Sequence, residues 1–304
     1  MKKILLKIGA ACIAVLAVFV MALPTIIHNL GLHPEYTGET HLLPAGKHAL
    51  IVTTSHGVLN AQGETTGEAT GIAISELTHP YYSYLDAGMK IDVASIKGGQ
   101  VPVDPSGLGR TMITPQDKRY LNDPALIAKV ENSLRIDDVN FNQYDVIFLV
   151  GGWGAAYDLG YSDVLAKKIG EAYYGPKEPL IGSVCHGALG LINVEDREGN
   201  KLIAGRAMTG VTDKQVKELG IELTPLHPET ELRKAGALFE SQTAFRDVFA
   251  THVAIDAEER FITGQNQNSG METAQKNDCH IGSEVGVDAG IEDQNPWPLT
   301  HRMP

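Results

Sequence analysis

The chain has 304 residues, 43% of them hydrophobic, which is enough apolar material to bury a core in one large domain or two small ones. Its formal net charge of −12, with no cluster of Lys and Arg beyond the N-terminus, argues against binding nucleic acid or anionic lipid through a basic surface. Three cysteines are too few for a disulfide framework and lack the paired spacing of a zinc site. We therefore expect small molecules or proteins as partners, and no metal or cofactor.

The N-terminus differs in kind from the rest of the chain. Lys2, Lys3 and Lys7 precede an uncharged run over residues 8–27. About 20 apolar residues can cross a membrane, whereas a cleaved signal peptide usually has an apolar core of about 7–15 residues. We predict that residues 1–28 form a membrane anchor, with a signal peptide as the alternative. Positive charge ahead of a span holds the N-terminus in the cytoplasm, so the domain is expected to be periplasmic or extracellular.

The composition changes after this run. Residues 29–47 contain Gly, Pro and His without apolar periodicity, which predicts a linker. One folded domain is expected over residues 48–290, with an irregular tail over residues 291–304. Irregular structure is expected already from Asn277, because the signals of regular structure fade there and prolines follow.

Apolar runs rich in β-branched residues alternate with segments of helical spacing inside the domain. The runs predict strands at residues 49–54, 90–96, 145–150 and 179–184. Helices are predicted at residues 124–134 and 159–174. This alternation predicts an α/β fold with a mostly parallel sheet covered by helices on both faces. Further along, a hairpin is predicted from residues 253–256 and 260–263.

The sharpest chemical signal is GSVCHG at residues 182–187, where a buried strand is followed by a glycine-rich turn. It has the pattern of a nucleophile elbow, in which small neighbours allow a strained backbone that aims Cys185 at a substrate. We expect the N-terminus of a following helix to point at the sulfur and to lower the pKa of the thiol. A buried, unreactive cysteine is the alternative.

Two neighbouring features could complete such a site. His186 could be the general base for Cys185, although adjacent residues on a turn point in different directions, and it could equally be a bystander. GGWG at residues 151–154 follows another predicted strand, and parallel strands end at a common edge of the sheet. The N–H groups of Gly152 and His186 could form an oxyanion hole there. A plain strand-to-helix turn is the alternative for GGWG.

Several motifs occur in an order that is specific in combination. They are ELTHPYY at residues 76–82, IDVAS at 91–95, GGQVPVDP at 98–105, GGWG at 151–154, VCHG at 184–187 and TGQN at 263–266. With this order the chain resembles, over about residues 48–275, the ThiJ/PfpI family of the class I glutamine amidotransferase-like superfamily. The likeness is to the branch that contains glyoxalase III enzymes and heat-shock holding chaperones.

The resemblance implies a flavodoxin-like three-layer sandwich in which Cys185 is the nucleophile and His186 its partner. It also implies that Glu76 lies close to the sulfur, where a carboxyl is expected to be protonated because two negative charges in contact are costly. Glu76 would then transfer protons. Gly152 and Trp153 are expected beside the substrate, although Trp153 replaces a histidine that is common in this branch and so alters the pocket wall.

The third acid of the family comes downstream of the cysteine, and here the alignment is imperfect. Asp213 is the nearest acid and is expected to orient His186. Gln215 stands near the position where this branch often has a glutamate, and Glu218 is a weaker candidate.

The reaction that the resemblance implies is a cofactor-free glyoxalase III conversion of methylglyoxal, or a related 2-oxoaldehyde, to the hydroxy acid, which is D-lactate for methylglyoxal. Cys185 would add to the aldehyde, and Glu76 or His186 would move a proton between the two carbons. A cysteine amidase or peptidase, and a stress holding chaperone or cysteine oxidation sensor, are the alternatives. The family also implies a homodimer, and outside the cytoplasm Cys185 could be oxidised onto Cys279.

Overall fold

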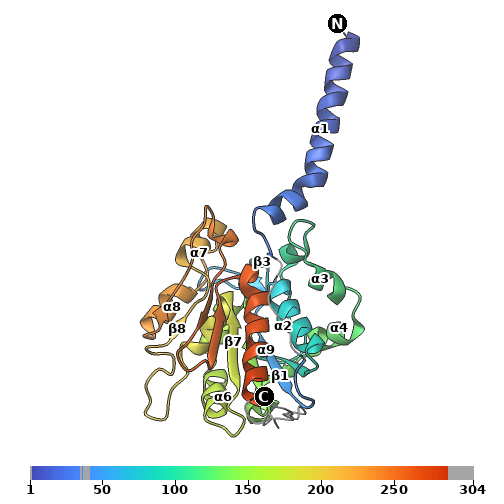
Figure 1. The fold of residues 1–304 in the computed structure, drawn as a ribbon. Coiled ribbons are helices and arrows are strands. Elements are labelled where there is room, and N and C mark those ends of the chain that lie inside the picture. Colours follow the sequence, from blue (N-terminus) through green and yellow to red (C-terminus); the bar gives the residue numbers. More distant parts are fainter. Residues whose placement is uncertain (1, 35, 37–41, 287–304) are drawn as a thin grey trace, which may run out of the picture.

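A sheet of seven strands organises the structure, which is a computed structural model that describes residues 2–34, 36 and 42–286 (Figure 1). The strand order is β10-β11-β7-β6-β1-β4-β5, and every neighbouring pair is parallel except β10 with β11. These strands are β1 (His48–Thr53), β4 (Lys90–Ser95), β5 (Leu134–Arg135), β6 (Val146–Leu149), β7 (Leu180–Val184), β10 (Val253–Ile255) and β11 (Phe261–Gly264). The expected α/β fold with a mostly parallel sheet is confirmed.

Helices cover both faces of this sheet. The α-helices are α1 (Lys2–Asn29), α2 (Ile74–Asp86), α3 (Pro115–Tyr120), α4 (Pro124–Glu131), α5 (Ala155–Asp158), α6 (Asp163–Tyr173), α7 (Asp213–Leu219), α8 (Pro228–Lys234) and α9 (Gly270–Gly286). Short 3₁₀ helices are η1 (Pro105–Leu108), η2 (Ile136–Asp138), η3 (Phe141–Gln143), η4 (Leu159–Tyr161), η5 (Cys185–Leu191), η6 (Asp247–Phe249) and η7 (Gln267–Ser269). Two-stranded sheets join β2 (Val58–Leu59) with β3 (Glu68–Ala69), and β8 (Ala207–Met208) with β9 (Leu238–Phe239).

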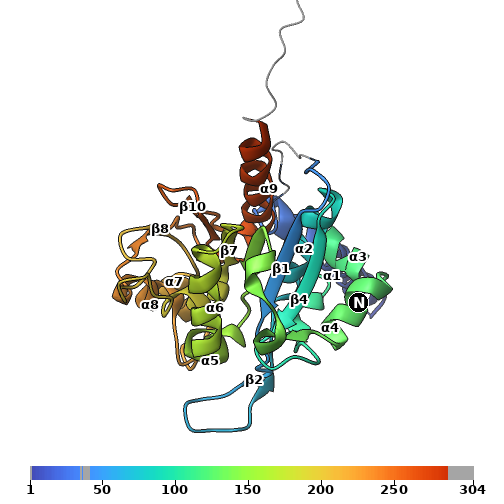
Figure 2. The same cartoon turned by 90° about the horizontal axis from the view of Figure 1, so that it is seen from below.

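The central strand β1 shows how the two layers form. Successive side chains of a strand point to opposite faces of the sheet. Leu50 and Val52 therefore join a core with α5, α6 and α8, whereas Ala49 and Ile51 join a second core with α2, α4 and α9. Figure 2 shows α5 and α6 on one side of the sheet and α2 and α4 on the other. This arrangement is the expected three-layer sandwich.

The predicted elements agree with the observed ones to within a few residues. All four predicted strands are present, as β1, β4, β6 and β7, and the predicted hairpin is the antiparallel pair β10 and β11. The predicted helix over residues 124–134 ends earlier, at Glu131. The predicted helix over residues 159–174 consists of two helices, η4 and α6. Ser162 separates them and caps α6, because its side chain accepts a hydrogen bond from the N–H of Leu165.

The expectation of irregular structure from Asn277 is wrong up to Gly286, where α9 ends. This helix packs beside α2 and against strands β7 and β11 of the sheet, and it buries polar residues. Thr273 Oγ1 donates to the carbonyl of Ser269, and Asn277 Nδ2 donates to that of Thr273. Because such polar residues stand at buried positions among the apolar ones, the helix carries little apolar periodicity. The predicted tail at residues 291–304 lies outside the described residues.

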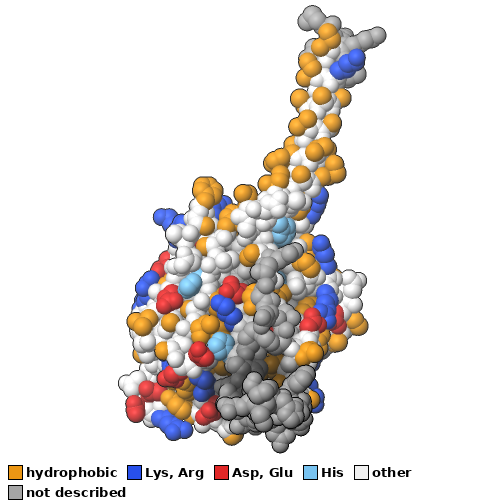
Figure 3. All heavy atoms as spheres, viewed as in Figure 1, with side chains coloured by type: hydrophobic (Ala, Val, Ile, Leu, Met, Phe, Trp, Pro, Cys, Tyr) orange, Lys and Arg blue, Asp and Glu red, His pale blue; other side chains and the backbone are white. Residues whose placement is uncertain are grey.

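The helix α1 projects away from the sandwich (Figure 1), and Figure 3 shows hydrophobic side chains along its length. Residues 7–29 are long and apolar enough to cross a membrane, but a signal sequence has the same properties. The membrane anchor therefore stays a prediction.

Part of the segment predicted as a linker packs on the domain. Leu32 is buried. The N–H of His33 donates to Asn268 Oδ1 at 2.8 Å, and Asn268 Nδ2 donates to the carbonyl of Gly31 at 3.0 Å. Asn268 therefore fixes the chain to the domain directly after α1.

Gly182, in the middle of β7, provides a test of the packing between the sheet and α9. A Cβ atom there would overlap the ring of Phe148 and lie 3.0 Å from Asn277 Nδ2. We predict that Gly182→Ala lowers the free energy of unfolding by about 1–3 kcal/mol, as overpacking of a core does. Urea denaturation measures the change. Leu238→Ala, at a side chain that is 60% exposed, is expected to stay within about 0.5 kcal/mol and serves as the control.

Candidate active site

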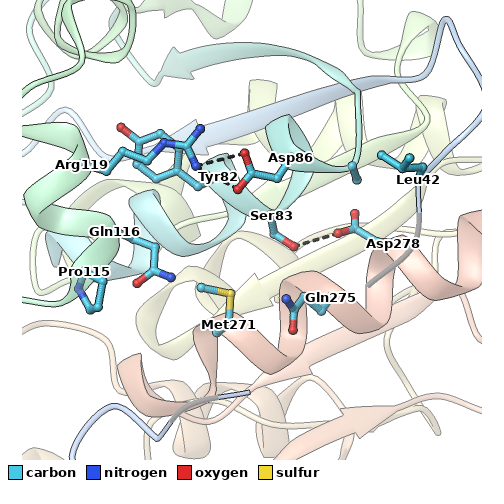
Figure 4. Close-up of a pocket in the computed structure, with 11 residues that line it drawn as sticks. Leu42, Tyr82, Ser83, Asp86, Pro115, Gln116, Arg119, Met271, Gln275 and Asp278 are labelled. Atoms are coloured by element: carbon cyan, nitrogen blue, oxygen red, sulfur yellow. Dashed lines mark hydrogen bonds and ion pairs between the residues drawn. The ribbon is translucent and has the colours of Figure 1, made fainter. Parts of the chain in front are cut away.

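Two cavities are candidates for the functional site, and their chemistry separates them. The one between α2, α3 and α9 has a volume of about 450 Å³, and its lining contains neither cysteine nor histidine (Figure 4). Four of its polar residues form two pairs, with Ser83 donating to Asp278 and Arg119 to Asp86. The second cavity, of about 260 Å³, is lined by Glu76, Cys185 and His186. It lies where β7 ends, at the edge at which open parallel sheets bind ligands.

The backbone at Cys185 is strained as predicted. Cys185 directly follows β7 and has a φ of 57°, in the left-handed region that non-glycine residues rarely adopt. Gly187 makes this turn feasible, because a Cβ atom there would overlap the carbonyl of Leu149. The sequence therefore holds the sulfur at the end of a central strand in a conformation that only the surrounding packing can maintain.

Glu76 approaches the sulfur from the first turn of α2 and is almost completely buried. Burial raises the pKa of its carboxyl to about 8. A hydrogen bond with Cys185 and main-chain N–H groups of Gly151 and Gly152 oppose part of this rise by favouring the charged form. Glu76 is therefore mostly protonated at neutral pH, in agreement with the expectation for a carboxyl beside this sulfur.

The expected decrease in the pKa of Cys185 is not found. The thiol is 5% exposed, and burial and the charge of Glu76 raise its pKa well above the ordinary value. N–H groups of His186 and Gly152 lower it only in part. The helix that was expected to stabilise a thiolate is η5, a 3₁₀ helix of seven residues, so its dipole is short. The resting pair of Cys185 and Glu76 therefore keeps its protons near neutral pH.

His186 contacts the sulfur through one ring nitrogen, Nδ1, which lies 3.4 Å from Cys185 Sγ. Burial, together with the nearby His227, lowers the pKa of His186 to about 3, so its imidazole is neutral at physiological pH. Among the described residues, His186 Nε2 has no hydrogen-bond partner. Its orientation is set by packing and by the sulfur.

Asp213 does not lie at this site, which corrects the expectation that it orients His186. Its carboxylate accepts a hydrogen bond from Thr230 Oγ1 at 2.7 Å on the exposed surface, where it begins α7. Glu218 is also turned away and accepts the N–H of Asp247 at 2.8 Å. Gln215, one turn into α7, lines the cavity instead. The element expected to supply the acid is therefore present, but an uncharged amide faces the site.

Gly152 and Trp153 line the cavity, as expected. Gly152 has a φ of +90°, and a Cβ atom there would overlap main-chain atoms of Gly71 and Ala73. Only glycine allows the chain to approach α2 this closely, and this approach brings the N–H of Gly152 to the sulfur of Cys185. That N–H is a suitable donor for an oxyanion formed on a carbon bonded to the sulfur.

His33 lines the same cavity and was not foreseen. Both of its ring nitrogens are buried without a hydrogen-bond partner in the described part of the chain. Its ring makes an edge contact with that of His79, with 6.2 Å between centroids. Burial lowers the pKa of His33 to about 4, so the imidazole is neutral. No sequence signal marked His33, because it lies in a segment without periodicity.

Two expectations about this site stay predictions, namely the absence of a metal or cofactor and the pairing of Cys185 with Cys279. Within residues 2–34, 36 and 42–286, no group of three His, Cys, Asp or Glu side chains could hold a metal ion. The absence of a cofactor remains a prediction. Cys185 is a free thiol, and the side chain of Cys279 lies outside the described part, so the pairing of these two cysteines stays a prediction.

Comparisons with known proteins agree with this geometry. The DJ-1/PfpI family matches residues 68–247, more than half of the 304 residues. The chain belongs to the DJ-1/PfpI family. Glyoxalase 3 of Candida albicans is 26% identical over 237 residues, which cover 74% of this chain and 94% of that protein. The glutathione-independent glyoxalase HSP31 of Saccharomyces cerevisiae is 26% identical over 181 residues, covering 59% of this chain and 74% of that protein.

Two solved structures show the same fold. The Rapid Encystment Protein 24 KDa of Francisella tularensis aligns with a TM-score of 0.69 at 33% identity, over 77% of this chain and 99% of that one. Glyoxalase III from Candida albicans aligns with a TM-score of 0.66 at 24% identity, over 75% of this chain and 95% of that one. The resemblance seen in the motifs is thereby confirmed.

The charge of Glu76 is a cause of the raised pKa of Cys185, and this can be tested by alkylation. Only the thiolate reacts, so the rate at which iodoacetamide alkylates Cys185 at each pH reports the pKa of this thiol. The rate is read from the peptide that contains Cys185, because Cys12 is also a free thiol and is exposed. We predict that Glu76→Gln moves the midpoint of this profile to lower pH, with about tenfold more thiolate for each pKa unit removed. Asp213→Asn, at an exposed carboxylate outside the cavity, is the matched control and should leave the profile unchanged. An unshifted profile in Glu76→Gln would contradict this coupling.

Glu76 also makes stability depend on pH. Its pKa is raised from 4.5 in the unfolded chain to about 8 in the folded one, so its contribution is complete below pH 4.5 and is lost as the pH rises through 8. We predict that Glu76→Gln flattens the decrease in unfolding free energy between pH 5 and 8.5, by up to about 1.4 kcal/mol per pKa unit. Urea denaturation at each pH measures it. Burial also raises the pKa of Asp278, to about 7, but Asp278 is present in both proteins. The difference between their two profiles of unfolding free energy against pH therefore reports Glu76 alone.

Proposed function

We propose that this protein is a glutathione-independent glyoxalase, which converts a 2-oxoaldehyde and water to a 2-hydroxy acid. The observation that carries the proposal is the shared cavity of Cys185, Glu76 and the N–H of Gly152. It combines a nucleophile, a group that exchanges a proton near neutral pH and a donor for an oxyanion. Support also comes from the relatives named as glyoxalases, the first of which aligns over 94% of its length.

The first step forms a bond between the sulfur of Cys185 and the aldehyde carbon. The thiol proton passes to the aldehyde oxygen, so the product is a neutral hemithioacetal. Glu76 is suited to carry this proton, because its pKa of about 8 makes both of its protonation states accessible. The N–H of Gly152 stabilises the oxygen while it carries negative charge.

The second step exchanges the oxidation levels of the two carbons. The ionised form of Glu76 removes the hydrogen of the hemithioacetal carbon as a proton and passes the same proton to the ketone oxygen, which gives an enediol and returns Glu76 to its carboxylate. Return of a proton to the second carbon, with loss of the hydroxyl proton on the first, gives a thioester of the 2-hydroxy acid. No external oxidant or reductant takes part. Water then hydrolyses the thioester and restores the thiol of Cys185.

The structure favours Glu76 over His186 as the group that moves the proton. The pKa of His186 is lowered to about 3, which makes its imidazole a weak base, whereas that of Glu76 lies near the working pH. In this proposal His186 is a neutral hydrogen-bond partner of the sulfur, at 3.4 Å. It helps to hold Cys185 in its strained conformation.

We also propose that α1 anchors the enzyme in a membrane, with the sandwich on the extracytoplasmic side. The support is the length and apolar composition of α1, its exposure, and the lysines that precede the apolar run. Detection of the full-length N-terminus in a carbonate-washed membrane fraction would test this, because cleavage or release would exclude an anchor.

We predict that the full chain, purified in detergent without glutathione, consumes methylglyoxal and produces lactate, and that Cys185→Ala abolishes this activity. Glu76→Gln should lower kcat by about 10²–10⁴-fold, the usual contribution of a positioned proton-transfer group. Asp213→Asn is the matched control and should keep the parental rate, because Asp213 bonds Thr230 away from the cavity. An active Cys185→Ala variant would exclude covalent catalysis at this sulfur.

A further inference from the structure

We propose that the active-site cavity opens at the membrane surface and prefers 2-oxoaldehydes with an apolar tail, which it takes up from the lipid. This inference rests on the proposed glyoxalase function and on the anchor formed by α1. It is carried by three observations, which are the place where α1 meets the domain, the side chains that line the cavity, and the apolar residues exposed beside it.

The first observation locates the membrane boundary. The side chains of residues 8–21 are uncharged and exposed, and these 14 residues span about 21 Å at ~1.5 Å per residue, most of the ~30 Å of a bilayer core, with Lys7 at the far end. Beyond them α1 bends toward the domain, where it contains Pro24 (Figure 1). Arg110 Nη2 donates to the carbonyl of Met21 at 3.2 Å. A guanidinium at this depth suits the boundary between hydrocarbon and headgroups.

The walls of the cavity come from segments that meet at this boundary. Met112 follows Arg110 by two residues and lines the cavity, and so does His33 in the segment after α1. The third such segment contains Val248. Asn268 Nδ2 donates both to the carbonyl of Gly31 at 3.0 Å and to that of Val248 at 2.6 Å, so one side chain joins two of the walls.

The lining of the cavity fits an apolar tail. Its reactive end holds Cys185, Glu76 and His186. Polar side chains also line it, but apolar side chains contribute most of the cavity surface, namely Ile74, Met112, Trp153, Val211, Leu219 and Val248. A volume of about 260 Å³ approaches the ~300–1,000 Å³ of pockets for larger ligands. Methylglyoxal, with a single methyl group, would leave much of this apolar surface without a partner. Burial of additional methylenes against it is favourable.

Apolar side chains are also exposed beside these walls. Phe245, three residues before Val248, is 94% exposed, and Leu30, at the end of α1, is 65% exposed. Aromatic side chains are enriched at membrane interfaces. The net charge of −12 does not favour attraction to anionic lipid, so contact with the membrane must come from such apolar groups and from α1.

The test of the substrate class uses the full chain in phosphatidylcholine vesicles and unbranched 2-oxoaldehydes with tails from methyl to octyl. We expect kcat/KM to rise with tail length by up to about fourfold per methylene. Val248→Thr, which places a hydroxyl of similar size in the wall, should reduce this slope. Val164→Thr, the same substitution at a partly exposed position of α6, is the matched control and should keep it. The slopes of the parent protein and of the two variants are compared in one vesicle preparation. Partitioning of the substrate into the lipid is then the same for all three and does not affect the comparison.

The outcomes distinguish this inference from the function on which it rests. Turnover of methylglyoxal with a slope of zero, or a slope that Val248→Thr leaves unchanged, would overturn the preference for apolar tails. Absence of turnover at every tail length would instead reject the glyoxalase function.

The position of the cavity at the membrane is tested without turnover. In vesicles of brominated lipid, the fluorescence of a tryptophan introduced by Phe245→Trp should be quenched, which is measured as a greater loss of fluorescence than in the parent protein. One introduced by Leu238→Trp, in β9, should not be quenched. Equal fluorescence of Phe245→Trp with and without bromine would place this face away from the lipid.

Discussion

The contact between the thiol of Cys185 and the carboxyl of Glu76 is the interaction on which the site depends. Both groups are buried, and neither charge is stable beside the other, so the pair holds at most one negative charge at low cost. Burial therefore keeps the resting nucleophile protonated and inert. In the proposed reaction, the substrate supplies the oxygen that accepts the thiol proton, which restricts the chemistry to molecules that fill the cavity.

The remainder of the sandwich maintains this contact. Cys185 stands at the end of a central strand with a left-handed backbone, and Glu76 lies in the first turn of a helix on one face. They can meet because Gly151 has no side chain, since a Cβ atom there would overlap Glu76 Oε2 and the backbone of Val184 and His186. The cores on the two faces fix the strand and the helix. Strain at one residue is thus maintained by burial distributed over the whole fold.

The sequence predicted the fold well because parallel strands buried on both faces leave continuous apolar runs. It also located Cys185, because an elbow needs small neighbours close in sequence. It failed where distant packing decides. The helix α9 buries polar residues and shows little periodicity, and the side chain of Asp213 turns outward to Thr230 while Gln215 faces the cavity. Whether the pKa of Cys185 is raised or lowered depends on burial, which the local sequence does not reveal.

His33 shows how a segment outside the sandwich can become part of the site. Its backbone is bound by Asn268, and its buried ring nitrogens have no partner among the described residues, although buried polar groups are normally hydrogen-bonded. A neutral imidazole with free capacity can donate to a carbonyl oxygen of a bound substrate, as enediol chemistry requires. Because His33 follows α1 so closely, the segment that joins α1 to the domain also supplies a wall of the cavity.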